Sequence, residues 1–62
     1  MNKSEKREIL IEFVVDGNAV KATAIDAETG VEASIVGPAG AARQALAQGA
    51  VRKLKYVLEK KR

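Results

Sequence analysis

The spacing of the hydrophobic residues changes partway along this chain, and that change limits the folds open to it. Between Glu8 and Val36, apolar side chains recur at every second position, a spacing typical of half-buried β-strands. From Pro38 to Arg62 they recur every three to four positions, a spacing typical of an amphipathic helix. We therefore expect an α+β domain over residues 8–62: an antiparallel three-stranded meander followed by one long C-terminal helix. Residues 1–7 show no such pattern and are expected to be flexible.

The first two strands form a predicted hairpin. One face of the first strand carries only apolar residues, namely Ile9, Ile11, Phe13 and Val15. The dipeptide Asp16-Gly17 suits a two-residue type I′ turn. With that turn, Phe13 lies opposite Val20 and the apolar residues of both strands share a face. A slip of one residue would move every side chain to the other face.

A second turn is predicted at Ala27–Gly30, where glycine can adopt a positive φ angle. A third strand then covers Val31–Val36. A four-residue loop pairs Ala24 with Ala33 and keeps the apolar residues on the same face. The alanine-rich strand is thus the middle strand of the sheet.

The helix is predicted to start near Pro38, because proline is favoured at the first helical position. It then extends for about 24 residues, or about 36 Å, whereas strands of eight residues reach only about 26 Å. We therefore expect the helix to lie across the sheet and to extend beyond it. Its core-facing stripe consists of Leu46, Ala47, Ala50, Val51, Leu54, Val57 and Leu58.

Such a chain is poorly equipped to fold alone. A domain of about 60 residues buries only about 60% of the surface that its unfolded chain exposes. Eleven of the 62 residues are alanine, and there is no cysteine to form a disulfide. One helix cannot cover both faces of a sheet, and the second face carries Leu10, Val14, Ile25 and Val36. We therefore expect a homodimer, formed through that second face, through the helix overhang, or by exchange of a helix that pivots at Val36–Gly40.

The predicted outer face of the helix has two interpretations. In the favoured one, Gly49 allows close approach of a second helix and Tyr56 is buried at the dimer interface. In the alternative, the face binds nucleic acid, with the ring stacking on a base. The residues of the alternative site are Arg52, Lys53, Tyr56 and Lys60. Charge asymmetry supports the alternative: residues 43–62 carry seven basic side chains against one acidic side chain, whereas acidic side chains outnumber basic ones before them.

Most kinds of chemistry are not expected. The chain has no histidine and no cysteine, which removes the common nucleophile–base pairs and the usual zinc ligands. The acidic segment Asp26–Glu32 lacks the spacing of a calcium-binding EF-hand loop. Segment Gly37–Ala41 lacks the Lys-Ser/Thr of a phosphate-binding loop. We expect no enzyme activity, cofactor, metal or small-molecule substrate. The expected function is that of a homodimeric interaction module, whose partner is another protein or its own copy.

No apolar run approaches the ~18 residues that a membrane-spanning helix needs. Segment Met1–Glu8 is polar, unlike the apolar region of a signal peptide. We therefore expect a cytoplasmic protein without a membrane partner.

Two segments, Gly30–Pro38 and Arg52–Leu58, resemble a family of short uncharacterised bacterial proteins, found mainly in alphaproteobacteria. The resemblance covers residues 8–60 and implies a domain of unknown function. Members of that family sometimes carry the name serine hydroxymethyltransferase. A 62-residue chain without histidine does not fit that cofactor enzyme.

The order of three strands and a helix also resembles the final part of double-stranded-RNA-binding domains. Those domains begin with another helix and place clustered lysines at the start of the last one. Here Ala39–Ala42 occupy that place, followed by Arg43 alone. The resemblance therefore does not imply RNA binding.

Overall fold

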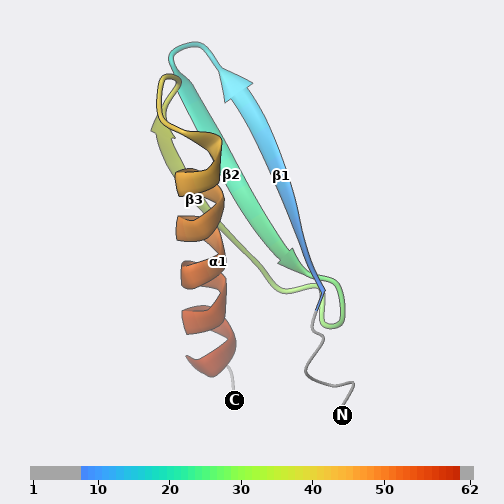
Figure 1. The fold of residues 1–62 in the computed structure, drawn as a ribbon. Helices are drawn as coiled ribbons and strands as arrows, with labels where there is room; N and C mark the ends of the chain where they lie inside the picture. Colours follow the sequence, from blue (N-terminus) through green and yellow to red (C-terminus); the bar gives the residue numbers. More distant parts are fainter. Residues whose placement is uncertain (1–7, 61–62) are drawn as a thin grey trace.

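The computed structural model describes residues 8–60, so the predicted flexible segment 1–7 lies outside the described residues. The elements are β1 (Ile9–Asp16), β2 (Ala19–Asp26), β3 (Glu32–Pro38) and α1 (Arg43–Lys60). The strands form one antiparallel sheet in the order β1-β2-β3, and α1 lies on one face of it (Figure 1). The α+β prediction, a three-stranded meander followed by a C-terminal helix, is confirmed.

The turn between β1 and β2 differs from the prediction by one position. Its two central residues are Gly17-Asn18, and Phe13 lies opposite Ala22 rather than Val20. The reason is conformational: Gly17 has a φ of 62°, and no described residue other than glycine has a positive φ. A type II′ turn needs a positive φ only at its first central residue, whereas a type I′ turn needs two. The pairing moves by two residues, so each side chain keeps its predicted face.

The second turn is confirmed together with its register, in which Ala24 pairs with Ala33. The N–H of Asp26 donates to the Val31 carbonyl at 2.8 Å, and the N–H of Gly30 donates to the Asp26 carbonyl at 2.8 Å. Gly30 has a φ of 82°. These contacts close the loop and fix β3 beside β2.

The predicted start of the helix at Pro38 is wrong. The third strand continues through Gly37 and Pro38, and α1 begins only at Arg43. Proline is tolerated at the end of an edge strand, where its missing N–H interrupts no ladder. The N–H of Ala39 instead donates to the Asn18 carbonyl at 2.8 Å, and that of Ala41 to the Pro38 carbonyl at 2.9 Å. These bonds form a connection that turns the chain back over the sheet.

The helix is therefore shorter than predicted. It has 18 residues, which corresponds to about 27 Å and so to about the length of a strand. Length alone no longer predicts an overhang. Figure 1 shows, however, that α1 is displaced along the sheet, so that its last turns extend beyond the nearby ends of β2 and β3.

The core lies between α1 and the second and third strands. Its buried side chains are Val20, Ala22, Ala24, Ala33, Leu46, Ala50 and Leu54. Glycines bring the two layers close together. A Cβ atom at Gly49 would lie 2.7 Å from Cδ1 of Ile35, and one at Gly37 would lie 2.6 Å from Cδ2 of Leu46. The helix thus rests on the part of the sheet where the side chains are small.

Candidate interaction surface

Strand β1 is exposed along almost its whole length, and only Ile9 is half-buried. On the helix side, the exposed fractions are 36% for Ile11, 39% for Phe13 and 58% for Val15. The prediction of one helix across all three strands is therefore wrong in one respect, because α1 covers β2 and β3 and leaves β1 largely uncovered. An apolar strand at the edge of the sheet thus faces solvent.

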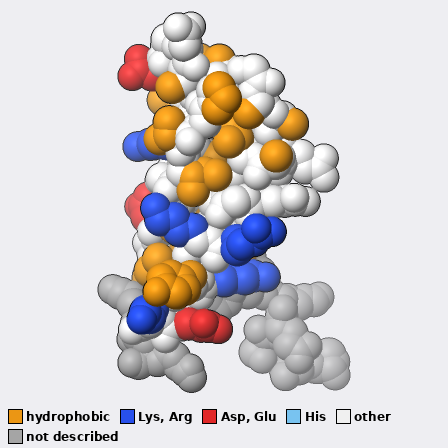
Figure 2. Space-filling view, turned by 90° about the vertical axis from the view of Figure 1, so that its left-hand side faces the viewer, with side chains coloured by type: hydrophobic (Ala, Val, Ile, Leu, Met, Phe, Trp, Pro, Cys, Tyr) orange, Lys and Arg blue, Asp and Glu red, His pale blue; other side chains and the backbone are white. Residues whose placement is uncertain are grey.

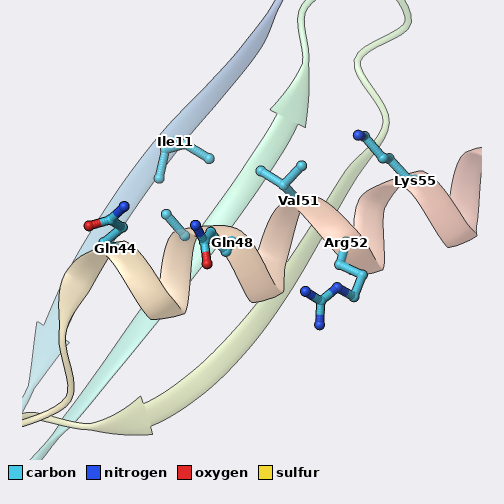
Figure 3. A pocket seen from close by; sticks show the side chains of 7 residues that line it. Ile11, Gln44, Gln48, Val51, Arg52 and Lys55 are labelled. Carbon is cyan, nitrogen blue, oxygen red and sulfur yellow. The ribbon is translucent and has the colours of Figure 1, made fainter.

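A shallow groove separates β1 from the helix. It has a volume of about 590 Å³, and its lining includes Ile11, Gln44, Gln48, Val51, Arg52 and Lys55. Figure 3 shows Ile11 on the strand side and Val51 pointing toward the strands, while the guanidinium of Arg52 points to the opposite side of the helix. Ile11 and Val51 therefore give the groove apolar walls, and the amides and cations of its lining lie along the helix.

A cation lies over an inner residue of the apolar row on β1. The Cζ atom of Arg43, the first residue of α1, lies 5.7 Å from the centre of the Phe13 ring. Such a cation–π contact contributes about 0.5–1 kcal/mol at an exposed site. It links the start of the helix to β1, the strand that the helix leaves uncovered.

The second face of the sheet carries the predicted interface residues, but not as one apolar patch. Leu10 pairs with Ile25, which is half-buried, at one end of the sheet. Val14 and Val36 are exposed at the other end, with Lys21 between them. Between these two groups lie polar side chains, in which Thr23 and Ser34 share a hydrogen bond of 2.8 Å between their hydroxyl oxygens.

The prediction that Gly49 lies on the outer face of the helix is wrong. Its position faces Ile35 of β3 at the close approach described above. Gly49 therefore serves the contact of the helix with its own sheet, because a larger residue would press on Ile35. This placement removes the reason for assigning it to a contact with a second helix.

The basic residues of the helix divide into different environments. Lys53 donates from Nζ to the Ser34 carbonyl at 2.9 Å, at the edge of β3. The Nζ of Lys60 lies 5.5 Å from the centre of the Tyr56 ring, which is 60% exposed. Arg52 is exposed and also lines the groove. In Figure 2, which faces this side of the molecule, Lys and Arg side chains gather in the lower half.

Hydrophobic spacing did not point to the groove residues Gln44 and Gln48 or to Arg43 beside Phe13. It also predicted that Ile11 and Phe13 lie under the helix. One signal could have located the helix. The large apolar residues of the helix-facing side are concentrated on the first strand, whereas the second and third carry several alanines there. Because a helix packs closest over small side chains, that distribution favours a position over the second and third strands.

The fold and this surface define a small α+β domain with an uncovered apolar edge strand. The chain belongs to a family described as a domain of unknown function (DUF6898), which matches residues 6–61. No curated protein and no solved structure matches the chain. Within residues 8–60, no cluster of metal-ligating side chains is present, and the one helix there is neither long nor apolar enough to cross a membrane.

Proposed function

We propose that this protein is a non-enzymatic interaction module that works as a homodimer. The observation that carries the proposal is the exposure of β1 on both faces, at the edge of the sheet. Burial of apolar surface contributes about 25 cal/mol per Å², and exposed apolar patches mark interaction sites. Edge strands also present backbone groups that pair readily with another chain. A second copy that binds to β1 would bury this apolar surface and pair with these backbone groups.

The helix side of the sheet supports this proposal better than the far side does. The far side carries the charged residues Glu12, Lys21 and Glu32 among its apolar ones. A dimer that stacked two such faces would take these charges out of water, which is costly unless each is paired. The helix-side row of β1 contains apolar residues only. We therefore propose that β1 is the contact surface and that α1 stays on its own sheet, without exchange between subunits.

The remaining parts of the proposal rest on the sequence. The lack of histidine and cysteine supports a non-enzymatic role. The resemblance to short bacterial proteins supports a bacterial origin. A cytoplasmic location is part of the same proposal.

Solution mass tests the proposal. We expect sedimentation equilibrium to give twice the chain mass of 6.6 kDa at high concentration and the single-chain mass on dilution. Val15→Asp should shift the equilibrium to monomer, because it places a charge on the row of β1. Val36→Asp is the matched control: Val36 is 66% exposed on the far side, so this variant should still dimerise. A mass of 6.6 kDa at every concentration would exclude the homodimer.

Nucleic-acid binding is the second candidate, favoured by the exposed Tyr56 ring beside Lys60 and Arg52. An aromatic ring with cations nearby can stack on a base while the cations contact phosphate. In a gel-shift titration, binding should then weaken steeply as salt is added. Tyr56→Ala should weaken it further, whereas Tyr56→Phe, which keeps the ring, should not. The absence of binding to mixed RNA and DNA at low salt would exclude this candidate.

A further inference from the structure

The backbone of β1 presents a regular set of free groups at the sheet edge. A two-residue turn is closed by a hydrogen-bonded pair, here Asp16 and Ala19, and such pairs alternate along a hairpin. The even-numbered residues of β1 therefore bond to β2. The bond from the Ala27 N–H to the Glu8 carbonyl, 3.1 Å, follows the same alternation. The outward N–H and C=O groups belong to the odd-numbered residues Ile9, Ile11, Phe13 and Val15.

The opposite edge of the sheet is partly blocked. On β3, the Lys53 side chain occupies the Ser34 carbonyl, and Pro38 has no N–H to offer. A charged side chain and a proline are two of the usual means by which edge strands avoid pairing. Pairing of β1 with β3 of another copy would also produce an open-ended assembly, whereas pairing of β1 with β1 gives a closed two-fold dimer.

Given the homodimer proposed above, we infer that two copies pair antiparallel through their β1 edges, with Phe13 of one copy facing Phe13 of the other on the two-fold axis. In this register Ile11 lies opposite Val15 of the second copy, and Glu12 lies opposite Val14. The outward groups of these odd-numbered residues then bond to one another across the axis.

Repulsion between like charges disfavours the two registers in which the two-fold axis lies one residue away from Phe13. An axis at Glu12 would place two carboxylates directly opposite, and an axis at Val14 would place Glu12 opposite Asp16. Like charges directly opposite on paired strands are destabilising. An axis at Ile11 avoids that contact, but it pairs fewer residues of the strand, because Val15 then lies opposite a position before Ile9.

The pairing joins two half-sites into one surface. It produces a six-stranded sheet with both helices on the same face, because a two-fold axis perpendicular to the sheet keeps each face on its own side. The groove between α1 and β1 of one copy then continues into that of the other. Ile11 and Phe13 of both copies form its floor.

Disulfide trapping tests the register, and the chain has no native cysteine to interfere. We expect an equal mixture of the Ile11→Cys and Val15→Cys variants to form a mixed disulfide on mild oxidation. Residues in a hydrogen-bonded antiparallel pair have Cα atoms about 5.5 Å apart, within the usual range for a disulfide. Each variant alone should cross-link little. Strong cross-linking of Ile11→Cys with itself would move the axis to Ile11 and overturn the assignment.

A proline variant tests the use of the edge itself. Val15→Pro removes an outward N–H that bonds to nothing else in the hairpin, so the monomer should fold while the dimer is lost. Val15→Ala, which keeps the N–H, should remain dimeric. A folded Val15→Pro dimer, or a doubled mass without the mixed disulfide, would overturn this pairing and leave the homodimer proposal intact. A single-chain mass for the unmodified protein would instead overturn the homodimer proposal.

Discussion

At the scale of single residues, the turn after β2 shows how one polar side chain organises a loop. Asp26 is fully buried, and the Thr29 hydroxyl donates to its Oδ2 at 2.7 Å. The same hydroxyl accepts from the Val31 N–H at 3.2 Å. A buried carboxylate is tolerated only where its oxygens find hydrogen bonds. Thr29 therefore connects the buried end of β2 to the start of β3.

Thr29→Val should destabilise the fold by about 1–3 kcal/mol, because it removes a hydrogen bond to a buried carboxylate and keeps the shape of the side chain. The free energy of unfolding from urea denaturation measures the effect. Glu28→Gln, at an exposed position of the same turn, serves as the control and should change stability by less than about 0.5 kcal/mol. Equal effects of the two variants would contradict this role for Thr29.

At the scale of elements, the position of α1 follows from side-chain size and chain connection. Alanines at positions 22, 24 and 33 and glycines at 37 and 49 let the helix approach β2 and β3 closely. The short connection from Pro38 to Arg43 also returns the chain beside β3. The bulkier Phe13 and Ile11 lie on the strand that the helix does not cover. The groove is the result of both constraints.

Gly49→Ala tests the close approach. Alanine favours a helix by about 1 kcal/mol over glycine, but its Cβ would press on Cδ1 of Ile35. The two effects oppose each other, so we expect a net change within about 1 kcal/mol of zero in the unmodified chain, since only a terminal methyl group must move. In an Ile35→Val background, which lacks that methyl group, the same change should stabilise by about 1 kcal/mol.

Urea denaturation of the four chains of this double-mutant cycle measures the coupling. A cycle with Ile25→Val, on the far face of the sheet, is the control and should show no coupling. If Gly49→Ala changes the free energy of unfolding equally with isoleucine and with valine at position 35, the Ile35 side chain does not oppose a larger residue at position 49, and the proposed close contact is contradicted.

At the scale of the whole molecule, the chain has more apolar surface than one helix can cover. Among residues 8–60, the core contains seven buried apolar residues, of which four are alanines. Leu10, Phe13, Val14 and Val15 remain exposed on one edge strand. A domain of this size has little stability in reserve. Association through β1 would add buried area where the single chain lacks it.

If the native state is a dimer, its unfolding temperature should rise with protein concentration, because association stabilises the native form by mass action. We expect the midpoint of thermal unfolding, followed by circular dichroism, to rise by a few degrees for each tenfold increase in concentration. The Val15→Asp variant should show a lower midpoint that does not depend on concentration. A concentration-independent midpoint for the unmodified chain would contradict a dimeric native state.

Much of the fold could be predicted because strand and helix periods are local properties of the sequence. The faces of β1 and β2 were correct even though the turn was misplaced by one residue, since a two-residue shift of register preserves the face of every side chain. The helix start was wrong because the signal of Pro38 is ambiguous: proline suits both the first turn of a helix and the end of an edge strand. The hydrogen bonds of Ala39 and Ala41 favour the second role, in which Pro38 ends the strand.

The candidate site was harder to predict than the fold. The predicted interface residues Leu10, Val14 and Val36 are exposed, but Lys21 lies between Val14 and Val36. The periodic pattern along one strand does not show which residues of neighbouring strands lie side by side. Gly49 was misplaced because a helical pattern assigns glycine to no face by itself.

The sequence by itself determined the order of elements, the faces of the strands and the second turn, because these depend on neighbours a few positions apart. Only the tertiary structure decided which two strands the helix covers. That choice depends on the sizes of side chains that lie far apart in the chain and meet only when the sheet and the helix pack. Leaving β1 uncovered is a consequence of that packing, and the proposed interaction surface exists because of it.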